Sequence, residues 1–184
     1  PDEPKVKGTL TIKEGGVVKT TSYMGIETRG SSSQMFPKKS YGVELWTEAG
    51  EDTSISLLGF PKESDWILYA PYTDKTMLRD VLTFYLASRM GHYASRFRFV
   101  ELTLNDEYLG VYVLLEKIKR GKSRVNISKM ESGDGAPDSL TGGYILKIDK
   151  TTGDWSGGWW SPYQTNGKSI LYQFEYPKAE NITS

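Results

Sequence analysis

Short runs of alternating apolar and polar residues predict that most of this chain folds as antiparallel strands. Gly15-Gly16 joins the first two runs, and Asn105-Asp106-Glu107 joins two later ones, as is typical of hairpins. The predicted strands are residues 6–13, 17–26, 39–46, 65–69, 97–104, 108–117, 125–127, 143–149 and 170–176.

One segment has the three- and four-residue spacing of an amphipathic helix. Its apolar stripe consists of Met77, Leu78, Val81, Leu82, Tyr85, Leu86 and Met90. Thr73 or Asp74 is suited to cap its start, and Gly91 is suited to end it. The predicted fold class is therefore α+β: a mainly antiparallel sheet with one long inserted helix, and not a doubly wound sheet.

The composition limits the kinds of protein that this chain can be. Its 184 residues suffice for a single domain or lobe over 1–184, with the polar segment 131–142 as a possible internal linker. Lys plus Arg and Asp plus Glu number 23 each, so no broad attraction to nucleic acid is expected. The chain has no cysteine, which excludes disulfides and thiol catalysis. It also has no run of 18 apolar residues, so no transmembrane helix is predicted.

A polar loop between two predicted strands holds the residues best suited to bind a ligand. These residues are Arg29, Gly30, Ser31, Ser32, Ser33, Lys38 and Lys39. Backbone N–H groups beside a glycine can surround a phosphate, and a nearby lysine can reach the same anion, although this spacing fits no standard P-loop. The same residues also suit a solvated loop between two strands.

Two carboxylates stand at the ends of predicted apolar strands. Glu116 could pair with a buried lysine or face a ligand, and it could equally be a surface acid at a strand end. Asp149 could contact a ribose hydroxyl or a metal, or it could cap the turn that follows. Trp155, Trp159 and Trp160 suit either a platform for carbohydrate stacking or a cover over the edge of the core.

Six segments, taken in order, resemble the spore coat protein H (CotH) family of atypical protein kinases. They are Arg29 to Ser33, residues 36–41, 74–79, 100–105, 107–112 with Glu116, and 142–149. The resemblance implies the N-lobe part of a divergent protein-kinase-like fold. It also implies a bacterial protein, secreted or at the cell surface, that phosphorylates protein Ser or Thr in its full-length form.

The resemblance further implies roles for the candidate residues. Lys38, with Lys39 as the second choice, would contact the α- and β-phosphates of ATP. Arg29 and Ser31, Ser32 and Ser33 would form the loop that covers the phosphates, and Glu116 would lie near the nucleotide or partner the lysine. Asp149 completes the implied nucleotide site. ATP with Mg²⁺ or Mn²⁺ is expected for the full-length protein only, with a protein substrate or surface and coat proteins as partners.

Departures from the family pattern limit this interpretation. The C-terminal half of the family carries an Asn-x-x-Asp-like segment and a Trp-Asp-x-Asp-like motif, and neither occurs in this sequence. Lys147 and Asp106 stand where the family usually has Glu and Gly, and residues 76–90 contain no Glu for the kinase ion pair. The catalytic acids are therefore expected beyond Ser184 or are missing, so no catalytic or metal-binding residue is assigned.

Two other functions fit the same residues. One is a non-enzymatic module for cell-surface or coat assembly, and the other is a carbohydrate-binding surface domain centred on the tryptophans. The polar, proline-containing residues 1–4 suit a linker left after a signal or anchor segment was removed, or simply the boundary of a chain segment; export is expected from the family and from this start.

Overall fold

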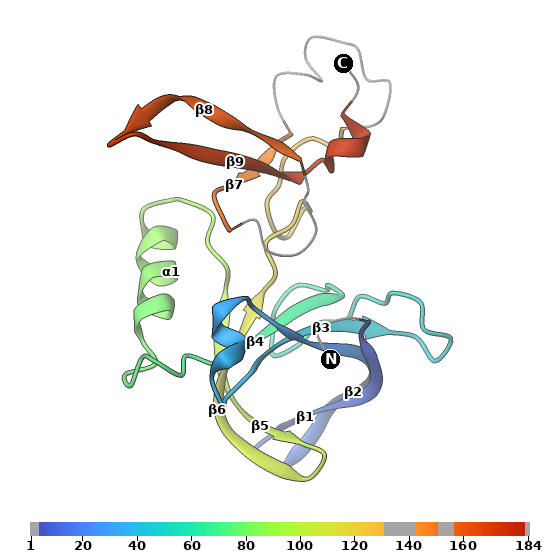
Figure 1. Cartoon of the computed structure of the whole chain (residues 1–184). Helices are drawn as coiled ribbons and strands as arrows, with labels where there is room; N and C mark the ends of the chain where they lie inside the picture. Colours follow the sequence, from blue (N-terminus) through green and yellow to red (C-terminus); the bar gives the residue numbers. More distant parts are fainter. Residues whose placement is uncertain (1–3, 131–142, 151–156, 183–184) are drawn as a thin grey trace. The chain divides into compact units, whose positions relative to one another are not determined.

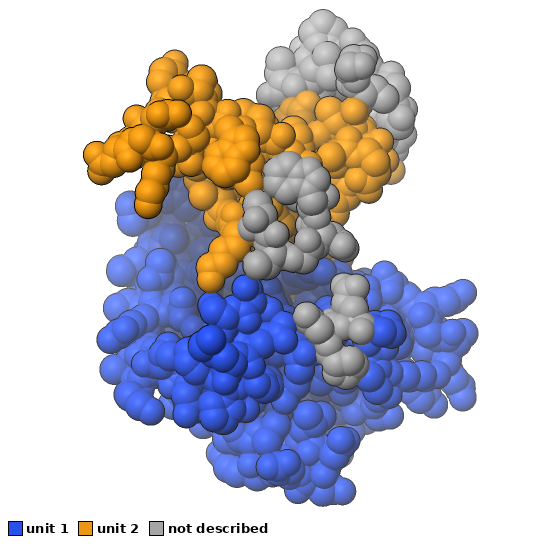
Figure 2. All heavy atoms as spheres, in the orientation of Figure 1, with its two compact units in different colours: residues 1–117 blue, residues 118–184 orange. Residues whose placement is uncertain are grey.

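The computed structural model describes residues 4–130, 143–150 and 157–182 and divides the chain into two compact units. Unit 1 is Pro1–Lys117 and unit 2 is Ile118–Ser184 (Figure 2). Each unit contains its own antiparallel sheet. That residues 1–184 act as one domain or lobe stays a prediction, and the predicted linker 131–142 lies outside the described residues.

Unit 1 is built on a six-stranded sheet with the order β1-β2-β3-β4-β6-β5. The strands are β1 (Val6–Glu14), β2 (Val17–Arg29), β3 (Ser40–Trp46), β4 (Asp65–Tyr69), β5 (Phe97–Leu104) and β6 (Glu107–Glu116). All neighbours pair antiparallel. The sheet curls into a half-barrel (Figure 1). Its two edge strands, β1 and β5, line the same cavity.

Alternation along the strands divides the core of unit 1 between the two faces of the sheet. On β6, Tyr112 and Leu114 belong to the concave core, which also contains Trp66. Val113 and Leu115 point to the other face, where Val81 of helix α1 (Arg79–Arg89) packs against them. Because one residue step reverses the face, the apolar run in β6 serves both cores.

The predicted α+β fold class with one long inserted helix is wrong. The described chain is mostly antiparallel sheet curled into a half-barrel, and α1 has only 11 residues. Its start is five residues later than the predicted cap at Asp74, whereas its end before Gly91 is as predicted, with Gly91 at φ 84°. Of the predicted apolar stripe, Val81 is buried, while Leu82 and Leu86 remain about half exposed.

Asp74 is the physical reason for the shorter helix. Its buried carboxylate accepts hydrogen bonds from the Thr76 backbone N–H (3.1 Å), the Thr76 hydroxyl (2.7 Å) and the Arg79 backbone N–H (2.9 Å). These bonds hold residues 74–78 as turns, and Met77 takes a positive φ of 56°, which interrupts helical geometry. Asp74 therefore caps α1 from outside, through a turn that periodicity does not reveal.

Replacing Asp74 with Ala should lower the melting temperature by a few degrees at pH 7, because the start of α1 loses its acceptor. The Arg79 backbone N–H, followed by the Thr76 hydroxyl, lowers the pKa of Asp74. Its contribution is therefore complete above the unfolded pKa of about 3.9 and is lost as the pH falls through the lower folded value. Thermal unfolding should show that the difference in melting temperature between Asp74→Ala and wild type becomes smaller at acidic pH. Glu48→Ala, which changes an exposed carboxylate, is the control. A difference that persists at low pH would contradict this prediction.

Unit 2 contains a three-stranded sheet with the order β7-β9-β8. Its strands are β7 (Ile145–Lys147), β8 (Gly158–Thr165) and β9 (Lys168–Tyr176). The strand predicted at 170–176 is confirmed, and the strand predicted at 143–149 is shorter than predicted. Strand β8 was not predicted, because its glycine, proline and adjacent tryptophans break the alternation of apolar and polar residues. The strand predicted at 125–127 is reduced to a single bridge between Arg120 and Val125.

Candidate functional site

The polar loop that follows β2 closes on itself. Gly30 has φ 108°, and a β-carbon there would lie 2.0 Å from the Ser33 hydroxyl oxygen, so this turn requires glycine. The short 3₁₀ helix η1 (Ser32–Met35) follows. Gln34 donates from its backbone N–H to the Ser31 carbonyl (3.1 Å) and from its amide to the Gly30 carbonyl (2.6 Å). The three serines therefore lie in a compact, defined turn at the end of β2.

Lys38 leaves this loop and reaches strand β6. Its ammonium donates a hydrogen bond to the Val111 carbonyl (2.6 Å) and lies 4.5 Å from the centre of the Tyr112 ring. Partial burial lowers the pKa of Lys38. Gly110 has φ 82°, and a β-carbon there would lie 3.7 Å from the ammonium. Gly110, with its positive φ, and the ring of Tyr112 thus border the position of the Lys38 ammonium.

Lys39 takes a different direction. Its ammonium donates to the Gln34 carbonyl, within the loop that contains the serines. The neighbouring Ser40 begins β3, where its hydroxyl accepts a hydrogen bond from the Ala70 N–H (3.0 Å) and its backbone pairs with Arg29. One short stretch of chain thus contains Arg29, the serine turn and both lysines. The ammonium of Lys38 contacts β6, whereas that of Lys39 contacts the loop.

Glu116 lies elsewhere in unit 1. Its side chain is 0% exposed and forms a two-pronged ion pair with Arg96, with Nη2–Oε1 at 2.6 Å and Nε–Oε2 at 2.9 Å. The Arg96 backbone N–H also donates to Glu116 Oε2 (3.1 Å). Val111, the acceptor for Lys38, is five residues away along β6, or about 17 Å. The structure therefore joins Glu116 to an arginine and does not bring it to Lys38.

Asp149 belongs to unit 2. Its carboxylate accepts a hydrogen bond from the Lys150 N–H (2.7 Å), and its backbone carbonyl accepts one from the Gln173 amide (2.6 Å). The turn that the sequence allowed Asp149 to cap involves Thr151 and Thr152, which lie outside the described residues, so that alternative stays a prediction. The neighbouring Lys147 forms an ion pair with Glu175 at 3.0 Å.

The aromatic residues of unit 2 divide into packed and exposed ones. Trp159 is 43% exposed and stacks on Tyr172 at 5.5 Å between ring centres, while Trp160 is 63% exposed. Trp155 lies outside the described residues. Trp159 is therefore partly a cover over its own sheet, and Trp160 offers an accessible ring.

Sequence reasoning missed three residues of these sites. Arg96 is 20 positions from Glu116, and no local pattern connects them. Tyr112 and Gly110 lie next to the ammonium of Lys38. The only signal for this position in the sequence is the glycine itself, because glycine permits a positive φ. The pairing of β5 with β6 brings Arg96 to Glu116, and the path of the loop brings Lys38 to β6.

The loop carries three cationic residues. Arg29, Lys38 and Lys39 are close in sequence, and Lys38 is fixed by two contacts. Carboxylates for a metal are a different matter: in the described ranges, no group of three or more His, Cys, Asp or Glu is placed to hold an ion. The described residues of the loop therefore offer positive charge for an anion.

A family model described as CotH kinase protein matches residues 26–181. The chain belongs to the CotH kinase family. All eight predicted site residues lie inside the range matched to the CotH kinases, whereas β1 precedes it. No curated protein matches the chain. Among the described residues, no helix of this CotH kinase family member is long and apolar enough to cross a membrane.

Proposed function

We propose that this chain is the nucleotide-gripping portion of a CotH-like atypical protein kinase, a bacterial protein that is secreted or at the cell surface. The main support is the ammonium of Lys38, which is held by Val111 and Tyr112 and follows the closed serine turn in the chain, inside the range matched to the family. Phosphoryl transfer depends mostly on positioning and on neutralising charge, so a cation held in place is the contribution such a portion makes.

In this proposal Lys38 contacts the α- and β-phosphates, and Arg29 with Ser31, Ser32 and Ser33 covers them. The Val111 carbonyl and the Tyr112 ring limit where the ammonium of Lys38 can lie. Lys39 would bring a second charge from the loop side. ATP, with Mg²⁺ or Mn²⁺, supplies the phosphoryl group in the full-length protein. Transfer to protein Ser or Thr also needs metal-binding acids, and the two acidic motifs of the family do not occur in this sequence, so residues 1–184 alone should be inactive.

Nucleotide binding by the full-length protein tests the role of Lys38. Lys38→Met keeps most of the apolar stem and removes the charge, so ATP affinity should fall about tenfold or more. Lys62→Met, which changes an exposed lysine outside the loop, should bind ATP like wild type. Calorimetric titration of both variants decides the matter: equal affinities would remove Lys38 from the site. Phosphorylation of a protein by purified 1–184 with ATP and Mg²⁺ or Mn²⁺ would show that the inactive-portion proposal is wrong.

Exposed aromatic rings on β8 favour a second candidate function, carbohydrate binding. Trp160 and Tyr163 are 63% and 83% exposed. Exposed aromatic rings of this kind can stack on sugars. Glycan binding that survives Lys38→Met but not Trp160→Ala would support this function, while assembly with surface or coat proteins by a chain that binds no nucleotide would support a non-enzymatic module.

A further inference from the structure

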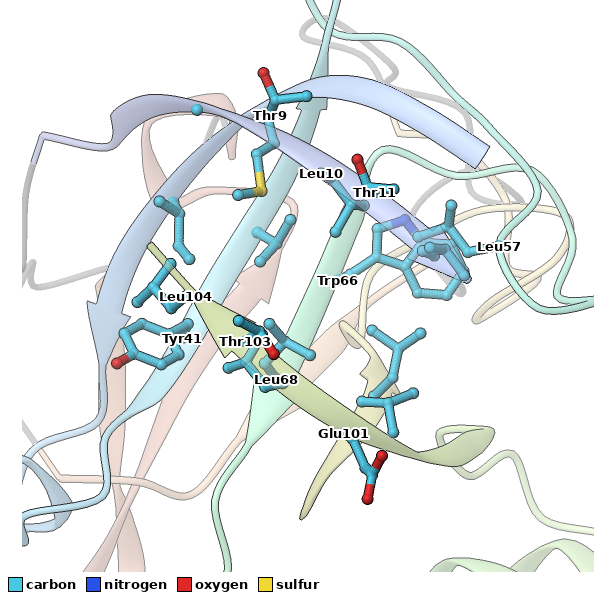
Figure 3. A pocket seen from close by; sticks show the side chains of 18 of the residues that line it. Thr9, Leu10, Thr11, Tyr41, Leu57, Trp66, Leu68, Glu101, Thr103 and Leu104 are labelled. Atoms are coloured by element: carbon cyan, nitrogen blue, oxygen red, sulfur yellow. The ribbon is translucent and has the colours of Figure 1, made fainter. Parts of the chain in front are cut away.

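The concave side of the half-barrel contains a cavity of about 1140 Å³, and Lys38 is not among its lining residues. Its walls are mostly apolar and come from both edges and the middle of the sheet, with Leu10 and Ile12 from β1, Val100 and Leu102 from β5, and Trp66 and Leu68 from β4. Figure 3 shows Leu10, Leu57, Trp66, Leu68 and Tyr41 around this space. The cavity is thus a feature of unit 1 alone.

The size and the chemistry of the cavity indicate its class of ligand. Ligand pockets have volumes of about 300–1000 Å³, and the cavity of unit 1 is slightly larger than that range. Apolar walls hold water poorly. From Arg98 to Leu104, β5 borders the cavity over six residue steps, which is about 20 Å. An elongated apolar chain fits these dimensions.

Arg98 places a positive charge at the rim. This exposed residue lines the cavity, and its guanidinium lies 5.1 Å from the centre of the buried Phe60 ring. Its Nη1 donates to the Phe97 carbonyl (3.0 Å), and it forms no ion pair with a carboxylate in the part of the chain that the structure describes.

Three acids, Glu14, Glu27 and Glu101, line the same cavity, and none of them forms an ion pair with Arg98 among the described residues. Glu27 forms an ion pair with Lys5 at 3.6 Å. Glu101 accepts a hydrogen bond from the Tyr108 hydroxyl (3.0 Å). The charge of Arg98 is therefore available to an anionic ligand group, and a carboxylate suits a guanidinium geometrically.

We propose that the cavity of unit 1 binds a long-chain carboxylate, such as a fatty acid. Its hydrocarbon chain lies between β1 and β5 over Trp66, and its carboxylate pairs with Arg98. The site uses β1, which precedes the range matched to the family, and it does not depend on Lys38. Failure of the nucleotide proposal would therefore leave this one intact.

Titration of the chain with saturated fatty acids of increasing length, followed by tryptophan fluorescence and calorimetry, tests the proposal. Affinity should rise about tenfold for every two added methylene groups until the cavity is full, because each buried methylene contributes a similar transfer free energy. Hexadecanol, which has the chain of palmitate without its charge, should bind about tenfold more weakly than palmitate.

Substitutions of the residues proposed to contact the carboxylate and the hydrocarbon chain of the ligand sharpen the test. Arg98→Gln should weaken palmitate about tenfold and leave hexadecanol unchanged, while Arg89→Gln, on the exposed surface of α1, should change neither. Val100→Trp places a large ring inside the cavity and should weaken binding of both. Leu102→Phe is a milder filling variant that should weaken both, and circular dichroism checks that each variant is folded.

Three results would overturn the proposal. The first is an absence of saturable palmitate binding by the wild-type chain. The second is undiminished binding by folded Val100→Trp and Leu102→Phe. The third is a concentration-dependent dimer that Val100→Trp dissociates, measured by sedimentation, because a second copy would then occupy the space between β1 and β5.

Discussion

Replacing Arg96 with Met should destabilise unit 1 by about 3 kcal/mol or more. The carboxylate of Glu116 is fully buried and accepts hydrogen bonds from two guanidinium nitrogens of Arg96. The burial of the negatively charged Glu116 is tolerated because the guanidinium of Arg96 pairs with it. Once the guanidinium is gone, the folded state carries a desolvated carboxylate with weaker compensation, whereas the unfolded state hydrates it freely.

Urea unfolding followed by intrinsic fluorescence measures this loss as a change in the free energy of unfolding. The double variant Arg96→Met with Glu116→Leu should recover much of the stability, since an apolar pair needs no charge compensation. Arg89→Met changes an exposed arginine of α1 and should stay within about 0.5 kcal/mol of wild type. A loss below about 1 kcal/mol for Arg96→Met would show that Glu116 does not depend on this arginine.

Replacing Trp66 with Ala should cost about 3–5 kcal/mol, the range for removing a large buried aromatic side chain. Trp66 is 1% exposed, stacks on Phe60 at 5.4 Å between ring centres, and donates its indole N–H to the Glu63 carbonyl (3.1 Å). The substitution enlarges a cavity that already exists under β1, so the sheet has few atoms with which to refill the space. Such a loss is a large part of the stability of a typical domain.

Trp160→Ala is the matched control for Trp66→Ala. Trp160 is 63% exposed, so its truncation should change the free energy of unfolding by less than about 1 kcal/mol. Trp66→Phe keeps a ring on Phe60 and should fall between the two alanine variants. Equal losses for Trp66→Ala and Trp160→Ala, measured by urea unfolding, would contradict the assignment of Trp66 to the core.

The strands were the most predictable part of the fold. Residues 65–69 and 97–104 are strands with the predicted limits, because apolar alternation and turn residues act locally. The helix was less predictable, since the side chain of Asp74 and the positive φ of Met77 override its apolar spacing. The loop of Arg29 to Lys39 was also recognisable in sequence as a turn between strands, although its nucleotide role stays a prediction.

The sequence by itself determined the family, the strand-rich character and the loop that carries the candidate cations, because these depend on residue types at short spacing. The tertiary structure decided which groups meet. Strand order brings β6 to Lys38, the pairing of β5 with β6 brings Arg96 to Glu116, and the curl of the sheet creates the cavity between β1 and β5. The physical reason is that contacts between distant residues depend on register and curvature, which local patterns do not encode.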